Sequence, residues 1–410
     1  MEQTLSLKCV YCGSGGPFNE EHVFSAGMGG NDKSFILIDL VCCKCNSEIF
    51  SKLELSVMRR SPTGIRRKFS QSKSRDRGPN TRAPSIETSS HFIIDNHGRC
   101  LEAEYAADGT NTMLAQILIE DNKVYFTASS DTHLRKLYSE LARALEMPVI
   151  HLIDKVKGSN KTFDVTTYEW FEDEYIQLAS EVLSKPPAIG IWLETFADKH
   201  PNASPRVYQR LAGQLNLRIP PKGDPAQLLR SMRRTLPSMS AKKKSTTESL
   251  IEQPIVHIEM NADLESITRV LAKTGVNLLI HTFGKEFVAR PEFDKVKKFA
   301  LTGIPARPLS SLGDKAKYFT NILFGSIPKQ SHCAMLVGVL AQNHTYDIYF
   351  NVCLYGSDFH SVLIATELPP DTFFEPIYLL VNHEKNSIRK LSWLEYQVEI
   401  LERPNNLFKQ

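Results

Sequence analysis

The spacing of hydrophobic positions changes several times along the chain, and each change predicts a different element. Residues 35–41 are almost wholly apolar, which predicts a short β-strand. Within residues 46–60 the apolar side chains recur every three or four positions, as in a helix with one buried face. They are Ile49, Phe50, Leu53 and Val57. A strand followed directly by a helix is therefore expected near the N-terminus.

From about residue 91 apolar and polar residues alternate, which predicts strands with one buried face. Two strand-turn-strand units are expected, at 91–105 and at 117–129. A helix with one leucine-rich face is predicted to begin at Asp131. Further predicted elements are a strand at 163–168, a helix at 172–183, and helix starts at Ser204-Pro205 and Asp224-Pro225. Together these elements predict an α+β domain over residues 88–236.

A second α+β domain is predicted over residues 254–410. It begins with a strand at 255–260, followed by helices at 263–283 and 291–301. Three alternating stretches then predict an antiparallel meander; they are residues 332–342, 346–356 and 359–367. His332 and His360 fall near strand ends, so a second site is a minor alternative beside a structural role.

Two polar stretches read as linkers between these parts. Residues 61–87 are rich in Ser, Pro, Gly and basic side chains, which predicts an irregular, basic linker. Residues 237–253 are polar and contain three consecutive lysines, so they predict a second linker or a long surface loop. The expected organisation is therefore 1–60, 61–87, 88–236, 237–253 and 254–410.

Composition narrows the class of protein. The chain has 410 residues, of which 42% are hydrophobic and 23% charged, as in ordinary globular domains. The formal net charge is only +3, so affinity for nucleic acid must come from local basic patches. No stretch is long and apolar enough to predict a signal peptide or a membrane span. Scattered cysteines outside the first 45 residues do not form a disulfide framework, so a cytoplasmic location is expected.

The N-terminal cysteines predict a metal site. Cys9 and Cys12 form one C-x-x-C pair, and Cys42 and Cys45 form a second. Two such pairs offer four thiolates to one tetrahedral zinc ion, whereas a disulfide or buried free thiols are the alternatives. Cys43 lacks the spacing and is interpreted as a bystander.

Candidate catalytic groups lie between and directly after these cysteine pairs. Glu21 and His22 are adjacent in the insert, and Asn46 follows the last cysteine. This arrangement resembles the HNH nuclease superfamily, the ββα-metal finger, in its four-cysteine zinc form, as in the endonuclease VII type. The resemblance covers residues 1–60, with glutamate in place of the commoner aspartate and Ser25 in place of proline. It implies His22 as general base, Glu21 and Asn46 as ligands of the catalytic metal, and Asn31 as the residue that braces the loop.

The chemistry of these residue types agrees with that resemblance. A neutral imidazole can deprotonate water near neutral pH. A carboxylate with an amide oxygen suits Mg²⁺ or Mn²⁺, which would offset charge on the scissile phosphate. Zinc would be structural, and the second ion catalytic. Basic residues after the finger are candidates for phosphate contacts in DNA, the alternative being a solvated tether; they are Arg59, Arg60, Arg66, Arg67 and Lys68.

The expected function is that of a metal-dependent HNH endonuclease acting on DNA, with double-stranded DNA the favoured partner. The larger remainder would recognise a target, bind an activating ligand or partner protein, or support an oligomer, as in antiviral defence or restriction systems. Two alternatives remain at this stage. One is a mobile-element or recombination nuclease such as a junction resolvase, and the other is a non-catalytic zinc module that binds nucleic acid or protein.

Overall fold

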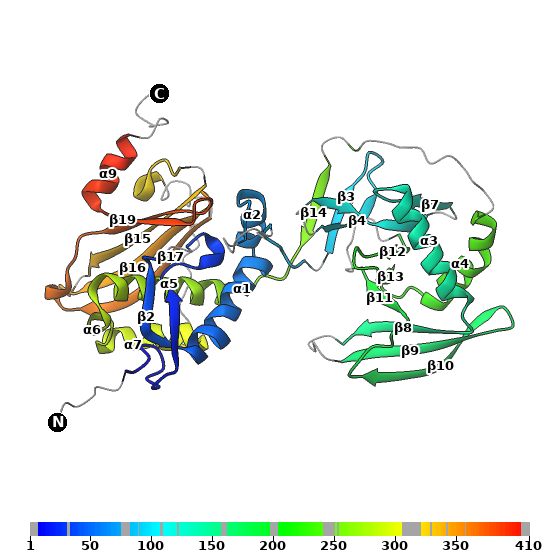
Figure 1. Ribbon diagram of the computed structural model, residues 1–410, viewed down its shortest axis with the longest axis horizontal. Helices are drawn as coiled ribbons and strands as arrows, with labels where there is room; N and C mark the ends of the chain where they lie inside the picture. Colours follow the sequence, from blue (N-terminus) through cyan, green and yellow to red (C-terminus); the bar gives the residue numbers. More distant parts are fainter. Residues whose placement is uncertain are drawn as a thin grey trace. The chain divides into compact units, whose positions relative to one another are not determined.

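The computed structural model describes most of the chain, as mixed α+β structure with antiparallel sheets (Figure 1). The described residues are 7–30, 33–74, 83–88, 90–106, 110–120, 123–156, 162–196, 204–240, 251, 254–305, 321–328, 330–341, 343–356 and 358–402. They form two compact units. Unit 1 combines residues 1–89 with 260–410, and unit 2 comprises residues 90–259. Among the described residues, no helix has both the length and the apolar character needed to cross a membrane.

Unit 1 contains a five-stranded antiparallel sheet in the order β17-β16-β15-β18-β19. Its strands are β15 (Ser331–Leu340), β16 (Tyr346–Leu354), β17 (Asp358–Leu368), β18 (Ile377–Asn382) and β19 (Ser387–Ser392). The first three form the predicted meander, joined by short turns. Strands β18 and β19 and the following helix α9 (Trp393–Leu401) are additional to the predicted elements.

The long helix α5 (Leu264–Phe283) lies at the centre of unit 1, where a helix was predicted. Asp263 caps its N-terminus, because its side chain accepts a hydrogen bond from the amide of Glu265 at 3.0 Å. Residues 266–280 of α5 are buried almost without interruption, as expected of a helix enclosed on all sides. Gly275 allows close approach to the sheet, since a Cβ there would lie 2.7 Å from Ile364 Cδ1.

The N-terminal part of unit 1 packs on α5. Strands β1 (Phe18–His22) and β2 (Ile36–Cys42) form an antiparallel hairpin, followed by the helical segment η2 (Lys44–Phe50) and helix α1 (Ser51–Arg60). Helix α5 contacts β2 and α1, and it also contacts β16 and β17 of the sheet. We call residues 9–60 the cysteine module. Its apolar side chains belong to the same hydrophobic core as those of α5 and the sheet.

The segment after the cysteine module differs from the predicted irregular linker. It forms helix α2 (Pro62–Ser70). Ser61 caps this helix and Pro62 occupies its first position, which is the favoured place for proline in a helix. Thr63, Gly64 and Arg67 are buried, so packing outweighs the turn-forming composition on which the linker prediction depended.

Unit 2 contains an eight-stranded sheet in the order β10-β9-β8-β11-β13-β12-β6-β7 and a four-stranded sheet in the order β14-β3-β4-β5. Most neighbours are antiparallel, although β11 runs parallel to β8 and β13. The strands are β3 (Ser90–Ile94), β4 (Cys100–Tyr105), β5 (Asn111–Met113), β6 (Ala115–Glu120), β7 (Lys123–Thr127), β8 (Val149–Lys155), β9 (Phe163–Phe171), β10 (Glu174–Leu183), β11 (Ile191–Thr195), β12 (Arg206–Gln209), β13 (Leu215–Ile219) and β14 (Ile255–Glu259). Helices α3 (Asp131–Glu146) and α4 (Pro225–Ser240) complete the unit.

Two helices predicted in this region are strands. Residues 172–183 were expected to be helical, but β10 pairs antiparallel with β9. Glu172 and Asp173 adopt φ values of +46° and +70°, so they form the tight turn that joins the two strands. The predicted helix start at Ser204-Pro205 is instead followed by β12, which is hydrogen-bonded to β6 on one side and β13 on the other.

The chain enters and leaves unit 2 through paired strands. β3 and β14 are antiparallel neighbours, with Ser90 opposite Glu259. The strand at 255–259 therefore belongs to unit 2, whereas the sequence grouped it with residues 254–410.

A buried ionic network joins the two sheets of unit 2. Arg218 of β13 pairs with Glu102 of β4 at 3.2 Å and with Glu194 of β11. Arg210 pairs with Glu104 and Glu194 at 2.5 and 2.8 Å. Burial opposes ionisation of Glu194, but the two guanidinium groups outweigh it and lower its pKa to about 2. These charges link the sheets in the folded protein.

Candidate metal centre and adjoining site

The first cysteine pair lies on a turn that the backbone closes on itself. The amide of Cys9 donates to the carbonyl of Ser14 at 2.8 Å, and the amide of Gly13 donates to the carbonyl of Cys9 at 2.9 Å. Gly13 has φ +73°, a left-handed conformation that glycine adopts without strain. The turn holds Cys9 and Cys12 in position to face the second pair.

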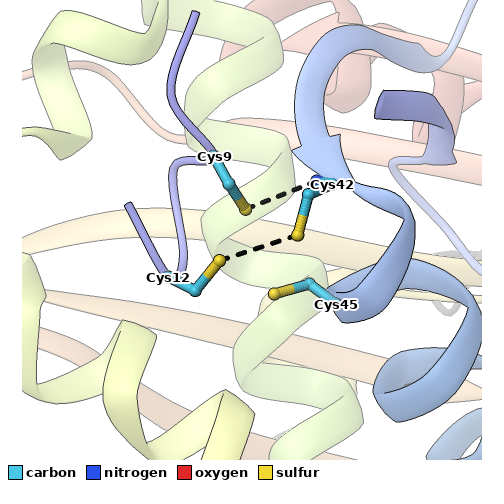
Figure 2. A group of neighbouring side chains, drawn as sticks. All are labelled: Cys9, Cys12, Cys42 and Cys45. Atoms are coloured by element: carbon cyan, nitrogen blue, oxygen red, sulfur yellow. Dashed lines mark hydrogen bonds between the residues drawn. The ribbon is translucent and has the colours of Figure 1, made fainter. Parts of the chain in front are cut away.

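The second pair comes from the end of β2 and the start of the following helical segment. The four sulfur atoms of Cys9, Cys12, Cys42 and Cys45 lie within 4.8 Å of one another (Figure 2). Zinc–sulfur bonds of about 2.3 Å in a tetrahedral site would hold the sulfurs roughly 3.8 Å apart. The cluster is therefore close enough to bind a metal ion. Cys43 lies outside it, as predicted.

The electrostatics of the cluster also fit a cation. A hydrogen bond from Cys45 lowers the pKa of the Cys9 thiol to about 4. Hydrogen bonding to Cys9 in turn raises the pKa of Cys45, and burial raises the pKa of Cys42. Four neighbouring thiolates would repel one another, so a divalent cation is needed before all can ionise. Four soft sulfur ligands, three of them on buried residues, form the donor set that zinc prefers.

Asn46 is held against the hairpin beside the cysteines. Its Nδ2 donates to the backbone carbonyl of Glu20 at 2.8 Å. Because a carbonyl oxygen only accepts, this bond determines which way the amide is turned and directs Oδ1 away from the strand. Asn46 is partly exposed.

The three residues at the end of β1 differ in exposure. Glu20 is exposed, Glu21 is 3% exposed, and His22 is partly exposed. The pairing with β2 is irregular between Asn19 and Glu21 and regular from Glu21 to His22, so the side chains of Glu21 and His22 project to opposite faces of the hairpin. Within the described residues, the Glu20 side chain forms no hydrogen bond or ion pair.

Glu21, expected to hold a catalytic metal, is instead in the interior beside α5. Its carboxylate pairs with Nζ of Lys273, which also pairs with Glu54 of α1 at 2.6 Å. Burial raises the pKa of Glu21, although Lys273 acts in the opposite direction. Burial alone would lower the pKa of Lys273, but the two carboxylates outweigh it and raise it. The structure thus gives Glu21 a cationic partner that the sequence did not suggest.

Asn31, expected to brace the loop after His22, lies outside the described residues. Around it, the described residues 25–30 are held from several sides. Arg67 and Gln71 of α2 both donate to the carbonyl of Gly27, at 2.7 and 3.4 Å. His332 of β15 hydrogen-bonds through Nε2 to the carbonyl of Met28 at 3.0 Å. Residues 25–30 are therefore fixed by side chains from α2 and the sheet.

His332 is a structural residue in this arrangement. Its Nδ1 accepts from the amide of Tyr355 at 3.0 Å, so Nε2 carries the proton that is donated to Met28. Burial, with a smaller contribution from His383, lowers its pKa to about 3. His360 lies on β17, which β16 separates from β15 in the sheet. The two histidines are therefore not neighbours in a second site.

The basic residues proposed to contact DNA fall into different environments. Arg59 and Arg60 are 40% and 58% exposed and both pair with Glu87, at 3.5 and 2.5 Å. Arg66 is 47% exposed and pairs with Asp358 at 2.5 Å. Arg67 is 3% exposed and donates to the carbonyl of Gly27, so it holds residues 25–30 in place and is not available for phosphate contacts. Lys68 is partly exposed.

The sequence analysis missed Tyr11, Lys273 and Asn277. Tyr11 lies inside the first C-x-x-C pair, and its hydroxyl donates to Asn277 Oδ1 at 2.6 Å. Lys273 and Asn277 stand four residues apart in the otherwise apolar stretch of α5. Polar residues with helical spacing inside an apolar helix were the available signal, because burial of such groups requires partners.

Comparison with models of protein families, with curated proteins and with solved structures gives no match to this chain.

Proposed function

We propose that this chain is a metal-dependent endonuclease of the HNH type, which hydrolyses phosphodiester bonds in DNA. The observation that supports this most directly is the arrangement at the end of β1. The amide of Asn46 donates to the carbonyl of Glu20, and His22, which is partly exposed, follows two residues later. A potential general base and two potential oxygen ligands, Asn46 and Glu20, therefore belong to exposed or partly exposed residues of the segments next to the cysteine cluster.

His22 acts in this proposal as the general base that accepts a proton from the attacking water. The fold around it favours such a role, because β1 is paired with β2 up to His22 itself. The strand end is also bound through its carbonyl to Asn277 at 3.1 Å. A base held by strand pairing and by this hydrogen bond can be aligned with a phosphate at little further cost in entropy.

Two metal ions have separate roles. Zinc in the cysteine cluster holds the turn, the hairpin and the helix together. Asn46 Oδ1 and the Glu20 carboxylate provide hard oxygen ligands suited to Mg²⁺ or Mn²⁺. When bound, that ion supplies positive charge that offsets the charge developing on the phosphate. Glu21 is not included among these ligands, because its carboxylate is buried against Lys273.

DNA is the proposed substrate because exposed arginines follow the hairpin in sequence. Arg59, Arg60 and Arg66 have side chains that are 40–58% exposed. Arg59 and Arg60 can exchange the exposed carboxylate of Glu87 for a phosphate, whereas Arg66 has its exposed surface available beside the more buried Asp358.

A cleavage assay with His22→Ala tests the proposal. Full-length protein is incubated with supercoiled and linear DNA in Mg²⁺, in Mn²⁺ or with a chelator. Wild type should cut only with metal, and His22→Ala should lose at least about a hundredfold in rate while retaining its zinc content. His97→Ala is the matched control, since His97 is an exposed histidine of unit 2. Undiminished cutting by folded His22→Ala would refute the proposal. Absence of cutting by wild type, with tight DNA binding, would favour the non-catalytic zinc module.

A further inference from the structure

Three separate segments of the cysteine module converge on one face of α5. Tyr11 comes from the first cysteine turn, Glu21 from the end of β1, and Glu54 from α1. All three bind Lys273 or Asn277, which lie four residues apart and therefore on the same side of the helix. The metal cluster, the hairpin and α1 are thus aligned by two side chains from a distant part of the sequence.

Asn277 is fully engaged by the module. It is wholly buried, its Oδ1 accepts from the Tyr11 hydroxyl at 2.6 Å, and its Nδ2 donates to Glu21 Oε1 at 3.2 Å and to the carbonyl of His22 at 3.1 Å. Both hydrogens of the amide have acceptors. The Tyr11 hydroxyl fixes the orientation of the amide, because it donates to the oxygen and so keeps the nitrogen towards β1.

We propose that Asn277 is a positioning residue for His22: it fixes the end of β1, and with it the direction of the imidazole, relative to the metal cluster. This rests on the proposed function of His22 as general base. Asn277 touches the backbone of His22, so it acts through that residue and takes no part in the chemistry. A hydrogen bond to the last carbonyl of a strand controls where the strand stops, and therefore where its final side chain projects.

Lys273 and its two carboxylate partners place a group of charges in the buried contact between the cysteine module and α5. It is 1% exposed and faces two carboxylates, so the hairpin and α1 both depend on α5 for their counter-charge. A buried carboxylate without its partner is strongly unfavourable, which keeps the module seated on α5. The Tyr11 oxygen also lies 3.2 Å from the backbone carbonyl of Lys273, while its single hydrogen follows the shorter, 2.6 Å contact to Asn277 Oδ1.

The alternative is that Asn277 only fills space and contributes stability. Asn277→Leu and Tyr11→Phe test this, with Thr274→Val as the matched control. Leu keeps the branched arrangement of the Asn277 side chain without its polar atoms, although it is larger, and Phe removes only the hydroxyl that orients the amide. Thr274 is buried on α5 and its hydroxyl bonds within the helix, to the carbonyl of Val270 at 2.8 Å, so Thr274→Val perturbs α5 without removing any of the hydrogen bonds to Tyr11, Glu21 or His22.

The first readout is the ring resonance of His22 in protein labelled at histidine, identified by its loss in His22→Ala. Positioning requires that this resonance shift or broaden in Asn277→Leu and in Tyr11→Phe and stay unchanged in Thr274→Val. An unchanged His22 resonance in a folded Asn277→Leu protein, or in Tyr11→Phe if that variant alone folds, overturns the inference. This readout is independent of nuclease activity.

The second readout is the separation of kcat from KM on DNA. Displacement of a base lowers kcat by about ten- to a hundredfold with KM unchanged. Equal kcat in Asn277→Leu and Thr274→Val would show that Asn277 contributes packing only and does not position His22. If the His22 resonance shifts while wild type and all variants fail to cut DNA, positioning is retained and the proposed nuclease function fails.

Discussion

At the scale of single residues, adjacent glutamates of one strand have opposite environments. Glu20 is exposed and its backbone carbonyl accepts from the Asn46 amide, whereas the Glu21 side chain is buried against Lys273. The four cysteines could be predicted from spacing alone, because a tight turn dictates where neighbouring sulfurs lie. The partner of Glu21 could not, since Lys273 reaches it only after α5 has packed on the hairpin.

Exchange of each glutamate for glutamine separates the two roles. Glu20→Gln should lower metal-dependent cleavage by roughly tenfold or more, because an amide binds Mg²⁺ less well than a carboxylate. Glu21→Gln should keep most activity, since glutamine can still accept from Lys273 and Asn277 while Glu54 balances the charge. Cleavage rates across a Mg²⁺ titration measure the difference. The reverse order of effects would restore Glu21 as the metal ligand.

At the scale of elements, contacts between separate segments determine secondary structure that the local sequence pattern did not predict. Residues 172–183 contain many good helix formers, yet they form β10 because the turn at Glu172 and Asp173 pairs them with β9. Helix α2 was hidden by turn-forming residues and is stabilised by its cap and by the burial of Arg67. The hairpin strand at 36–42 and the helices α1, α3 and α5 agree with the sequence prediction, because each has a regular apolar spacing.

Arg67 is buried whereas Arg59, Arg60 and Arg66 are exposed, so we expect their substitution to have different effects. A triple alanine variant of Arg59, Arg60 and Arg66 should bind all DNA more weakly. Its log affinity should also fall less steeply with log salt, by roughly 0.9 for each phosphate that the variant no longer neutralises. Arg67→Met should instead lower thermal stability with little change in salt slope, because it removes the bond to Gly27. Binding isotherms at several salt concentrations, with melting curves, test both. A triple variant with the wild-type slope would leave these arginines as surface ion pairs only.

At the scale of the whole molecule, the cysteine module and the sheet of unit 1 share one core. Cys9, Cys42 and Cys45 belong to the same buried cluster as Leu278 and Phe350. The sequence predicted a separate finger over residues 1–60. Local periodicity shows which residues have an apolar face to bury, but it does not show which distant part of the chain packs on that face. The structure adds α5 and the five-stranded sheet to that core.

Metal removal should therefore affect more than the module. Structural zinc can contribute about 10–16 kcal/mol, which is comparable with the total stability of a domain at about 5–15 kcal/mol. Chelation or Cys45→Ser should raise amide hydrogen exchange in α5 and β16 as well as in the hairpin, and leave unit 2 unchanged. Exchange measured by mass spectrometry locates the change, and Cys43→Ser is the control because Cys43 lies outside the cluster. An increase confined to residues 7–60 would contradict a shared core.

The pairing of Ser90 with Glu259 has a consequence for how this chain is put together. Opposed residues of antiparallel strands lie only about 5 Å apart, so the two points where the backbone passes between the units are neighbours. Unit 2 is thus an insertion whose ends meet, and a short reverse turn could take its place without stretching the chain on either side. Insertions of this geometry can be lost, gained or exchanged in a single genetic event while the host fold stays continuous. The same two points of the chain that carries the cysteines and His22 are therefore suited to accept a different inserted domain.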